Sequence, residues 1–413
     1  MVYVQNIDGN PLMPTTRFGK VRRMLKDGLA KVVRREPFVI RLNYETTEHT
    51  QPISLGVDAG IAHIGLSATT TNKELYAAEL QPRTDIIGLI AERKDYRHSR
   101  RVRKLRHRKI RQNNRKKKEG WIPPSTKHCV DTHLRIIKEI YAILPVSSLT
   151  IEIGQFDLRK IQDPGVSGLD YQRGEMFGFW NVREYVFFRD QHTCLHCKGK
   201  SKDKILNVHH LESRRVGGDS PSNLITLCET CHKAFHQGKF DLDIKRAPSL
   251  RGAGTISVMR WELYRQAKSL YSNIHITHGF TTKNTRIRCG LKKSHIVDAR
   301  CISGNPTSNA AANFYFIKQM RRHNRKIHKY NPIKGGLRKL NQAPYIVKGF
   351  RLFDKVVYEG ENCFIFGRRR RGYFDLRKLN GEKVHPCAKS EKLHLLSRAK
   401  RFLIETKKAE EHL

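Results

Sequence analysis

The chain has 413 residues, of which 80 are Lys or Arg and 38 are Asp or Glu, so its formal net charge is +42. A balance this basic implies a polyanionic partner, although charge alone leaves open a ribosomal or chromatin-like binder without chemistry. The sequence has no apolar run of about 18 residues and no signal-peptide pattern, and its nine cysteines favour a reducing compartment over a disulfide framework. We therefore expect a cytoplasmic protein that does not bind membranes.

The first 50 residues predict a small α+β unit. Residues 17–27 are typical of a helix that ends at Gly28, because glycine readily takes the left-handed conformation beyond a helix C-terminus. Two short apolar runs then predict strands on either side of Pro37, at Val32–Val33 and Phe38–Ile40.

The next segment predicts three strands in succession, at 53–57, 61–69 and 74–80. Asp58 falls at the end of the first strand, and Ala59-Gly60 allows a tight turn into the second. A basic run follows, in which 15 of the 26 residues from Arg93 to Lys118 are Lys or Arg. Such a run is either a solvated, partly disordered segment or a helix that nucleic-acid phosphates neutralise, and we favour the helix.

Regular patterns return after a linker at 120–124. An amphipathic helix ending at Pro145 is predicted by Leu134, Ile137, Tyr141 and Leu144, and residues 149–153 predict a strand that contains Glu152. A cysteine-rich module occupies about 178–245. Beyond it we expect a helix marked by Ile256, Met259, Leu263 and Leu270, a strand at 273–280, a short helix at 295–302, several strands at 345–385 and a final helix at 389–410.

The cysteine-rich module contains two Cys-x2-Cys pairs, separated by 30 residues. Thiolates are the preferred ligands of Zn²⁺, and this spacing is typical of a structural tetrahedral site. We therefore predict that one Zn²⁺ is bound by Cys194, Cys197, Cys228 and Cys231. A plain zinc ribbon that only shapes a binding surface would have the same four cysteines.

Histidines and an asparagine between and after the cysteines argue for more than a ribbon. His209-His210 lies in the loop, Asn223 follows, and His232 and His236 are spaced to share one helix face. Phosphodiester hydrolysis needs a base and a cation, which imidazoles and oxygen ligands can supply. The segment resembles the HNH nucleases with their ββα-metal fold. That resemblance implies His210 as general base, and His209, Asn223 and His232 as residues that hold or orient Mg²⁺ or Mn²⁺, with His236 bracing the helix.

Three dispersed carboxylates form a second constellation: Asp58, Glu152 and Asp298, the last accompanied by His295. Each lies on or beside an apolar element, where an ionised group is costly unless it is paired or metal-bound. Taken singly, each has an ordinary structural explanation as a turn, edge-strand or surface residue. Converging on one sheet edge, they could hold two Mg²⁺ ions that clamp a phosphodiester.

The order of these features resembles RuvC-type nucleases of the RNase H-like fold that are split by an HNH insertion, and among them the IscB family of transposon-associated, RNA-guided DNA endonucleases. The resemblance rests on five segments along the chain. They are Pro11-Leu12-Met13-Pro14, Gly56-Val57-Asp58-Ala59-Gly60, the basic run, Thr150-Ile151-Glu152 and His295-Ile296-Val297-Asp298-Ala299.

The resemblance implies an α/β multidomain chain, with an RNase H-like (RuvC) core, an inserted ββα-metal HNH domain, a small α+β N-terminal domain and a small C-terminal β-domain. The expected boundaries are 1–50 for the N-terminal domain, 51–84, 121–177 and 246–308 for the RuvC parts, 85–120 for an arginine-rich bridge helix, 178–245 for the HNH domain and 309–413 for a C-terminal domain that contacts guide RNA and a target-adjacent motif.

The resemblance also implies a function: RNA-guided cleavage of double-stranded DNA by a protein that is monomeric with its structured guide RNA (omega RNA), in a prokaryotic cytoplasm. The HNH domain would cut the guide-paired strand through His210. The RuvC centre would cut the displaced strand through Asp58, Glu152, His295 and Asp298, with Mg²⁺ or Mn²⁺ at both centres and a structural Zn²⁺. Guide RNA would lie along Arg93, Arg97, Arg100, Arg101, Arg103, Lys104, Arg106, Arg108 and Arg111. The alternatives are a protein-only HNH endonuclease and a non-catalytic RNA-binding transposition accessory.

Overall fold

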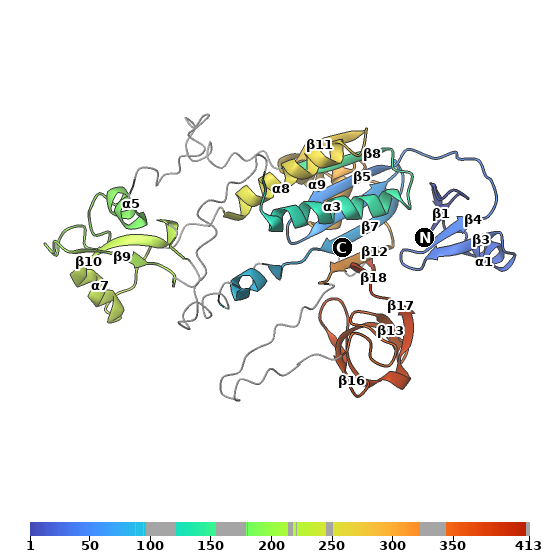
Figure 1. Ribbon diagram of the computed structural model, residues 1–413. Coiled ribbons are helices and arrows are strands. Elements are labelled where there is room, and N and C mark those ends of the chain that lie inside the picture. Colours follow the sequence, from blue (N-terminus) through green and yellow to red (C-terminus); the bar gives the residue numbers. More distant parts are fainter. Residues whose placement is uncertain are drawn as a thin grey trace. The chain divides into compact units, whose positions relative to one another are not determined.

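The computed structural model describes residues 1–86, 88–93, 95, 121–153, 179, 181–213, 218–219, 221–244, 251–321 and 344–409. The chain is mixed α/β with several sheets and divides into two compact units. Unit 1 comprises Met1–Gly154 and Val258–Leu413, and unit 2 is the segment Gln155–Ser257 inserted between them (Figure 1). Within the described ranges, no helix combines the length and apolarity needed to cross a membrane.

A four-stranded sheet in the order β2-β1-β4-β3 begins unit 1. Its elements are β1 (Val2–Gln5), β2 (Pro11–Thr15), α1 (Phe18–Lys26), β3 (Ala30–Arg34) and β4 (Val39–Leu42). Val21 is the buried residue of α1 and packs with apolar strand residues in one core cluster. Gly28 follows the helix with φ +71°, so the predicted helix and its glycine stop are confirmed.

The central sheet of unit 1 has seven strands in the order β11-β8-β5-β6-β7-β12-β18. Strands β5, β6 and β7 form the predicted antiparallel succession, β8 joins β5 in parallel, and β11 joins β8 in parallel. The strands are β5 (Ser54–Ala59), β6 (Ile64–Thr69), β7 (Glu74–Gln81), β8 (Ser148–Ile153), β11 (Ile274–His278), β12 (Asn313–Gln319) and β18 (Phe402–Lys408).

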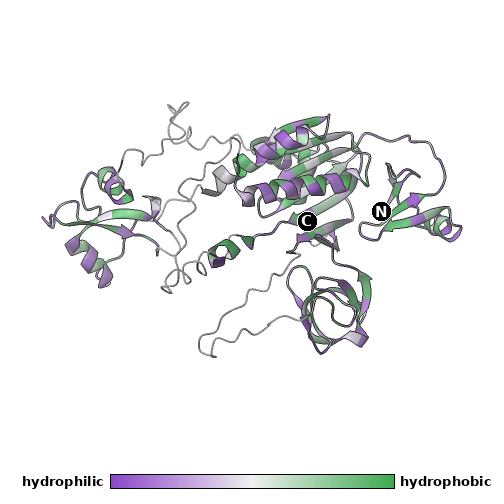
Figure 2. Cartoon of the chain, viewed as in Figure 1, coloured by the Kyte–Doolittle hydropathy of each residue, from purple (hydrophilic) through white to green (hydrophobic). Residues whose placement is uncertain are grey.

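Helices cover both faces of the central sheet. Successive strand residues point to opposite faces, and Leu55 and Val57 pack in one core with α3 (Pro124–Tyr141) and α8 (Arg251–Lys268). Residues Gly56 and Asp58 therefore face the other side, where α10 (His295–Ile302) lies close to β5 and β6. Figure 2 shows hydrophobic residues along the strands of this sheet and hydrophilic residues on the viewer's side of α3.

Three boundaries between 121 and 302 differ from the sequence-based expectation. Helix α3 already begins at Pro124, since proline at the first helical position needs no hydrogen-bonded N–H. Leu270 lies beyond α8 and is 63% exposed, while Ala267 takes the core position. Strand β11 ends at His278, and the unpredicted helix α9 (Gly279–Arg288) follows directly.

The C-terminal part of unit 1 contains a five-stranded antiparallel sheet in the order β16-β15-β14-β13-β17. Its elements are β13 (Lys355–Tyr358), β14 (Glu361–Arg369), β15 (Tyr373–Arg377), β16 (Lys383–Lys389), the short 3-10 turn η4 (Ser390–Lys392) and β17 (His394–Ser397). The helix predicted at 389–410 is wrong. That segment forms β17 and β18 instead, because β18 pairs along its whole length with β12 and buries Phe402, Leu403 and Ile404.

Unit 2 contains a helix, a hairpin and a second helix. The elements are α5 (Val182–Arg189), β9 (Leu206–His210), the 3-10 turn η2 (Pro221–Asn223), β10 (Leu224–Cys228) and α7 (Glu229–His236). Strands β9 and β10 pair antiparallel and α7 follows β10 without a loop, which gives the ββα order expected from the sequence.

Candidate functional site

Two carboxylates share one face of the central sheet. Strands β5 and β8 are parallel neighbours in which Val57 pairs with Ile151, so Asp58 and Glu152 occupy corresponding positions one residue further on. Leu55, Val57 and Ile151 pack into the core on the opposite face, which leaves the two carboxylates on the side of α10. Asp58 is 8% and Glu152 9% exposed, so both acidic side chains are buried beside each other.

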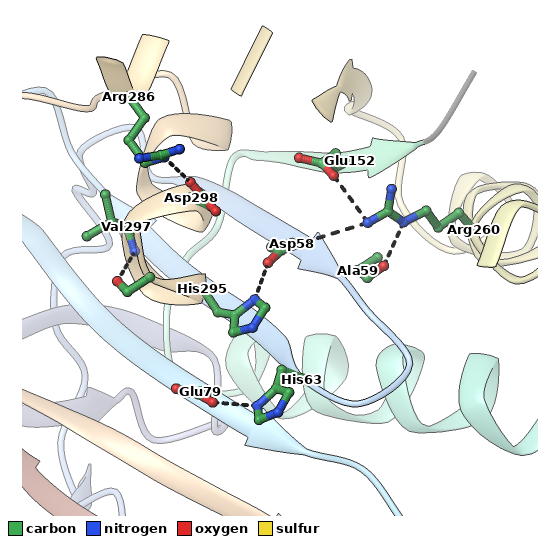
Figure 3. A network of polar contacts seen from close by, with 11 residues as sticks. Asp58, Ala59, His63, Glu79, Glu152, Arg260, Arg286, His295, Val297 and Asp298 are labelled. Carbon is green, nitrogen blue, oxygen red and sulfur yellow. Dashed lines mark hydrogen bonds and ion pairs between the residues drawn. The ribbon is translucent and has the colours of Figure 1, made fainter. Parts of the chain in front are cut away.

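Helix α10 brings His295 and Asp298 to the same place. The Ser294 hydroxyl caps the helix by accepting a hydrogen bond from the Val297 N–H. His295 Nδ1 then lies 2.7 Å from Asp58 Oδ2, and Asp298 lies on the adjoining turn of the helix (Figure 3). The four residues of the predicted dispersed constellation therefore converge in the folded chain.

Two glycines permit this close approach of α10. A Cβ at Gly65, the strand partner of Asp58, would lie 1.9 Å from the backbone oxygen of His295, and a Cβ at Gly56 would lie 2.0 Å from that of Ala299. Contacts this short are impossible for real atoms, so the absence of a side chain at both positions sets the distance between helix and sheet.

Gly65→Ala is expected to lower the free energy of unfolding by about 1–3 kcal/mol or more, because α10 must move off the sheet. Gly19→Ala is the matched control: it adds a methyl to α1 with nothing within 4 Å, and it should leave stability unchanged or raised by up to about 1 kcal/mol. Urea unfolding of both variants measures the difference. Equal stability of Gly65→Ala and the parent chain would contradict this account of the helix position.

Two arginines face the carboxylates. Arg260 Nη2 of α8 lies 3.1 Å from Glu152 Oε1 and 3.8 Å from Asp58 Oδ1. Arg286 Nε of α9 lies 3.0 Å from Asp298 Oδ1 (Figure 3). Sequence reasoning missed both arginines. No local spacing connects Arg260 with Asp58, about 200 positions earlier in the chain, and Arg286 lies on helix α9, which was not predicted.

The carboxylates influence one another electrostatically. Burial raises the pKa of Glu152, and the nearby negative charge of Asp58 raises it further. Burial and the charge of Asp58 raise the pKa of Asp298 in the same way, while the hydrogen bond to Asp58 raises the pKa of His295. A group of acids that resist joint ionisation is the environment in which a bound cation is favourable.

Carboxylate oxygens and an imidazole are donors that suit Mg²⁺ or Mn²⁺, so the residues present fit such an ion. Their spacing is wider than in a closed metal cluster. Across the described residues, two groups bring three or more His, Cys, Asp or Glu ligand atoms within 4.8 Å of one another, and both lie in unit 2. The carboxylates of unit 1 are instead interleaved with the two guanidinium groups.

A further histidine lies beside this centre. The rings of His63 and His295 stack with centroids 5.0 Å apart and an interplanar angle of 3°, and His63 Nδ1 lies 2.7 Å from Glu79 Oε1. His63 lies between β5 and β6, five residues after Asp58. Nothing else in the sequence indicated that it would stack on His295.

The four cysteines of unit 2 form the predicted cluster. The thiols of Cys194, Cys197, Cys228 and Cys231 lie within 4.8 Å of one another. Cys197 Sγ and Cys228 Sγ are 3.8 Å apart, which equals the separation of about 3.8 Å that Zn–S bonds of about 2.3 Å impose in a tetrahedron. The donor set and its spacing therefore fit a structural zinc ion.

Three histidines form the second cluster. His209 of β9 and His232 and His236 of α7 bring their ring nitrogens within 4.8 Å of one another. His209 Nε2 is buried without a hydrogen-bond partner. Burial, followed by the neighbouring histidines, lowers the pKa of His209 to about 4, so its imidazole is neutral and able to bind a cation. His236, which the sequence suggested only as a brace, belongs to this cluster.

Asn223, which the resemblance implied as a residue that holds or orients the metal, makes three hydrogen bonds to backbone groups. Its Oδ1 accepts a hydrogen bond from the Glu212 N–H, and its Nδ2 donates to the backbone oxygens of Glu212 and Gly218. The side chain is fully buried, so these bonds connect Glu212 and Gly218 to the turn that precedes β10. His210, the last residue of β9, lies at the start of that loop, with Nε2 3.0 Å from Asp219 Oδ1.

The basic run lies almost entirely outside the described residues. Arg93 falls in a helical stretch. The other residues expected to bind RNA lie in the part that is not described, namely Arg97, Arg100, Arg101, Arg103, Lys104, Arg106, Arg108 and Arg111.

Comparisons with known proteins identify two regions. Residues 2–174 match the family model described as RRXRR protein, and residues 194–238 match the HNH endonuclease model. No curated protein matches the chain. The second region contains the cysteine and histidine clusters, which therefore belong to an HNH endonuclease domain, and HNH domains use divalent metal ions.

Three solved structures of Streptococcus thermophilus Cas9 are similar to parts of the chain, each at 12% identity. The complex with AGGA PAM has a TM-score of 0.30 and covers 44% of this chain, the complex with GGAA PAM 0.31 and 59%, and the complex with AGAA PAM 0.32 and 61%. The matched parts span 26%, 31% and 32% of the respective Cas9 chains.

Proposed function

Starting from the RRXRR and HNH matches, which make this chain an IscB-like nuclease, we propose that it is an RNA-guided endonuclease of double-stranded DNA. The HNH domain cuts the strand paired to the guide, and a RuvC-like centre cuts the displaced strand. The observation that carries the proposal is the presence of two separate candidate centres with different donor chemistry: imidazoles in unit 2, carboxylates in unit 1.

The topology of the central sheet supports a RuvC-like core. An antiparallel β5-β6-β7 succession, with β8 and then β11 added in parallel on the side of β5, is the strand arrangement of RNase H-like folds. Asp58 and Glu152 lie on its two central parallel strands, and α10 adds His295 and Asp298. In this reading Asp58, Glu152 and Asp298 hold the cations, and His295 is oriented by its hydrogen bond to Asp58.

The histidines of the HNH centre have two different roles. His209, His232 and His236 hold a divalent ion, which when bound stabilises negative charge on the scissile phosphate. His210 takes the proton from the attacking water, and Asp219 orients its imidazole through the contact at Nε2. Asn223 keeps the connecting loop in place.

The net charge of +42 supports a large polyanionic partner beyond the DNA at the two centres. We assign that partner as a structured guide RNA bound by one copy of the protein, along the arginine-rich run and the N-terminal domain. Base pairing then selects the target, while protein contacts to a short flanking motif lie in the C-terminal domain.

The proposal is tested with protein purified together with its cellular RNA. We expect RNA of defined sequence to copurify, and a duplex that carries its complement to be cut on both strands in Mg²⁺. Ribonuclease treatment should abolish both cuts, and adding back the RNA should restore them. Cleavage that survives ribonuclease would contradict guidance by RNA, and copurified RNA without any cleavage would contradict the nuclease assignment.

A further inference from the structure

Arg260 occupies a position among the carboxylates that the proposed chemistry does not use. Its Nε donates a hydrogen bond to the backbone oxygen of Ala59 at 2.7 Å, while Nη2 is 3.1 Å from Glu152 Oε1 and 3.8 Å from Asp58 Oδ1. The side chain is only 14% exposed. One guanidinium therefore bridges the last residue of β5 and the two acids on the sheet (Figure 3).

The helix that carries Arg260 holds it firmly in this position. Met259, Leu263 and Ala267 of α8 are completely buried in the core under the central sheet. Their spacing follows the helical repeat, so α8 has a fixed rotation about its axis. Arg260 lies next to Met259, at the rim of this apolar face, and reaches the carboxyl end of β5.

The guanidinium and a divalent cation would compete for the same two carboxylates. A cation held by Asp58 and Glu152 would lie beside the positive charge of Arg260, which already contacts both side chains. Two positive charges that share buried oxygens a few ångströms apart repel each other strongly, since few water molecules screen them. Binding of the cation therefore requires Arg260 to leave at least one of its carboxylate partners.

We propose that Arg260 is a built-in competitor of the divalent cation at the carboxylate centre, and that it sets the Mg²⁺ concentration at which this centre works. The inference rests on the proposed function for the identity of the centre. Without a cation, the positive charge of Arg260 compensates the negative charges of Asp58 and Glu152. When the cation binds, Arg260 gives up at least one of these ion pairs. Its bond to the Ala59 backbone anchors the side chain at the site during this exchange.

The test measures cation binding at this one site in the complete protein with its RNA. Fe²⁺ replaces Mg²⁺ as the probe, and hydroxyl radicals made with ascorbate and peroxide then cut the backbone beside the bound iron. Added Mg²⁺ protects the site, and the Mg²⁺ concentration that halves the cut near residues 58 and 152 reports its affinity. The cut near His209 and His232, in unit 2, is an internal control.

For Arg260→Gln we expect at least about a tenfold lower protecting Mg²⁺ concentration, because one competing positive charge is removed. Arg260→Lys keeps the positive charge but loses the planar guanidinium that contacts both carboxylates. Its protecting Mg²⁺ concentration should therefore lie between those of Arg260→Gln and the parent. The matched control is Arg265→Gln on the same helix, whose side chain is 71% exposed and paired with Glu262; it should match the parent. Mg²⁺ dependence of displaced-strand cleavage should shift in parallel.

Two failures are distinguishable. In the first, the iron cut near residues 58 and 152 is lost in Asp58→Asn, but Arg260→Gln needs the same or a higher Mg²⁺ concentration for protection. This result overturns the competition and leaves the proposed function intact. A chain that shows no Asp58-dependent cut at all has no cation site there, and the RuvC-like centre of the proposed function fails together with this inference.

Discussion

Asp58→Ala is expected to abolish cleavage of the displaced strand while the guide-paired strand is still cut at the parental rate. Asp58 is the acid on which the centre of unit 1 depends: it accepts from His295 at 2.7 Å, faces Arg260, and raises the pKa of both Glu152 and Asp298. Its loss removes the proposed cation ligand together with the partner of His295. We expect the displaced-strand rate to fall by at least about 10³-fold.

His210→Ala should produce the converse result. If His210 is the general base that we propose, cutting of the guide-paired strand should slow by about 10²–10⁴-fold, while the displaced strand is still cut. Duplexes labelled separately on each strand, incubated with each variant, measure both rates in one reaction. Asp85→Ala, at a carboxylate that is 49% exposed and paired with Arg83, is the control and should cut both strands normally. Loss of both cuts in either variant would contradict independent centres.

Cys228→Ser is expected to unfold the HNH unit and to release its zinc. Three of the four cysteines, Cys194, Cys228 and Cys231, are part of the larger apolar cluster found among the described residues of unit 2, together with Ile225 and Leu227. Structural zinc in small domains contributes about 10–16 kcal/mol of folding free energy. Without the metal, the cysteines no longer hold α7 against the hairpin. The histidine cluster would then disperse.

The measurement is zinc content together with limited proteolysis across 179–244. We expect less than one bound zinc per chain, rapid cleavage in this range and loss of guide-paired cutting, while displaced-strand cutting by unit 1 persists. Cys387→Ser is the matched control, because Cys387 is half-buried in β16, outside the cluster. Retention of zinc and protease resistance by Cys228→Ser would show that the cysteines do not staple the unit.

Local patterns predicted the elements that carry the candidate centres. A buried apolar run followed by Asp-Ala-Gly located β5 and the hairpin after it, and helix α10 has the predicted bounds, 295–302. The spacing of His232 and His236 predicted that they share one helix face, and both lie on α7 with their ring nitrogens in one cluster. His209 and His210 were expected in a loop, but they end strand β9.

Elements that depend on distant partners were missed. Strand β18 is rich in residues that also suit helices, and its pairing with β12, almost 90 positions earlier, decided its conformation. Helix α9 begins Gly279-Phe-Thr-Thr, a poor helical sequence, yet it follows β11 directly and its Thr282 is buried. The ion pairs of Arg260 and the backbone hydrogen bonds of Asn223 are side-chain contacts that no spacing rule encodes.

The insertion of unit 2 has a consequence for how such chains can be rebuilt. Unit 1 is interrupted after Gly154 and resumes at Val258, and Glu152 and Arg260, two residues from either junction, are 3.1 Å apart at their charged ends. The chain therefore leaves unit 1 next to one member of this ion pair and re-enters it next to the other. The pair connects the two sides of the insertion without any residue of unit 2, so a foreign module could be inserted between these junctions while the contact of Glu152 with Arg260 is kept.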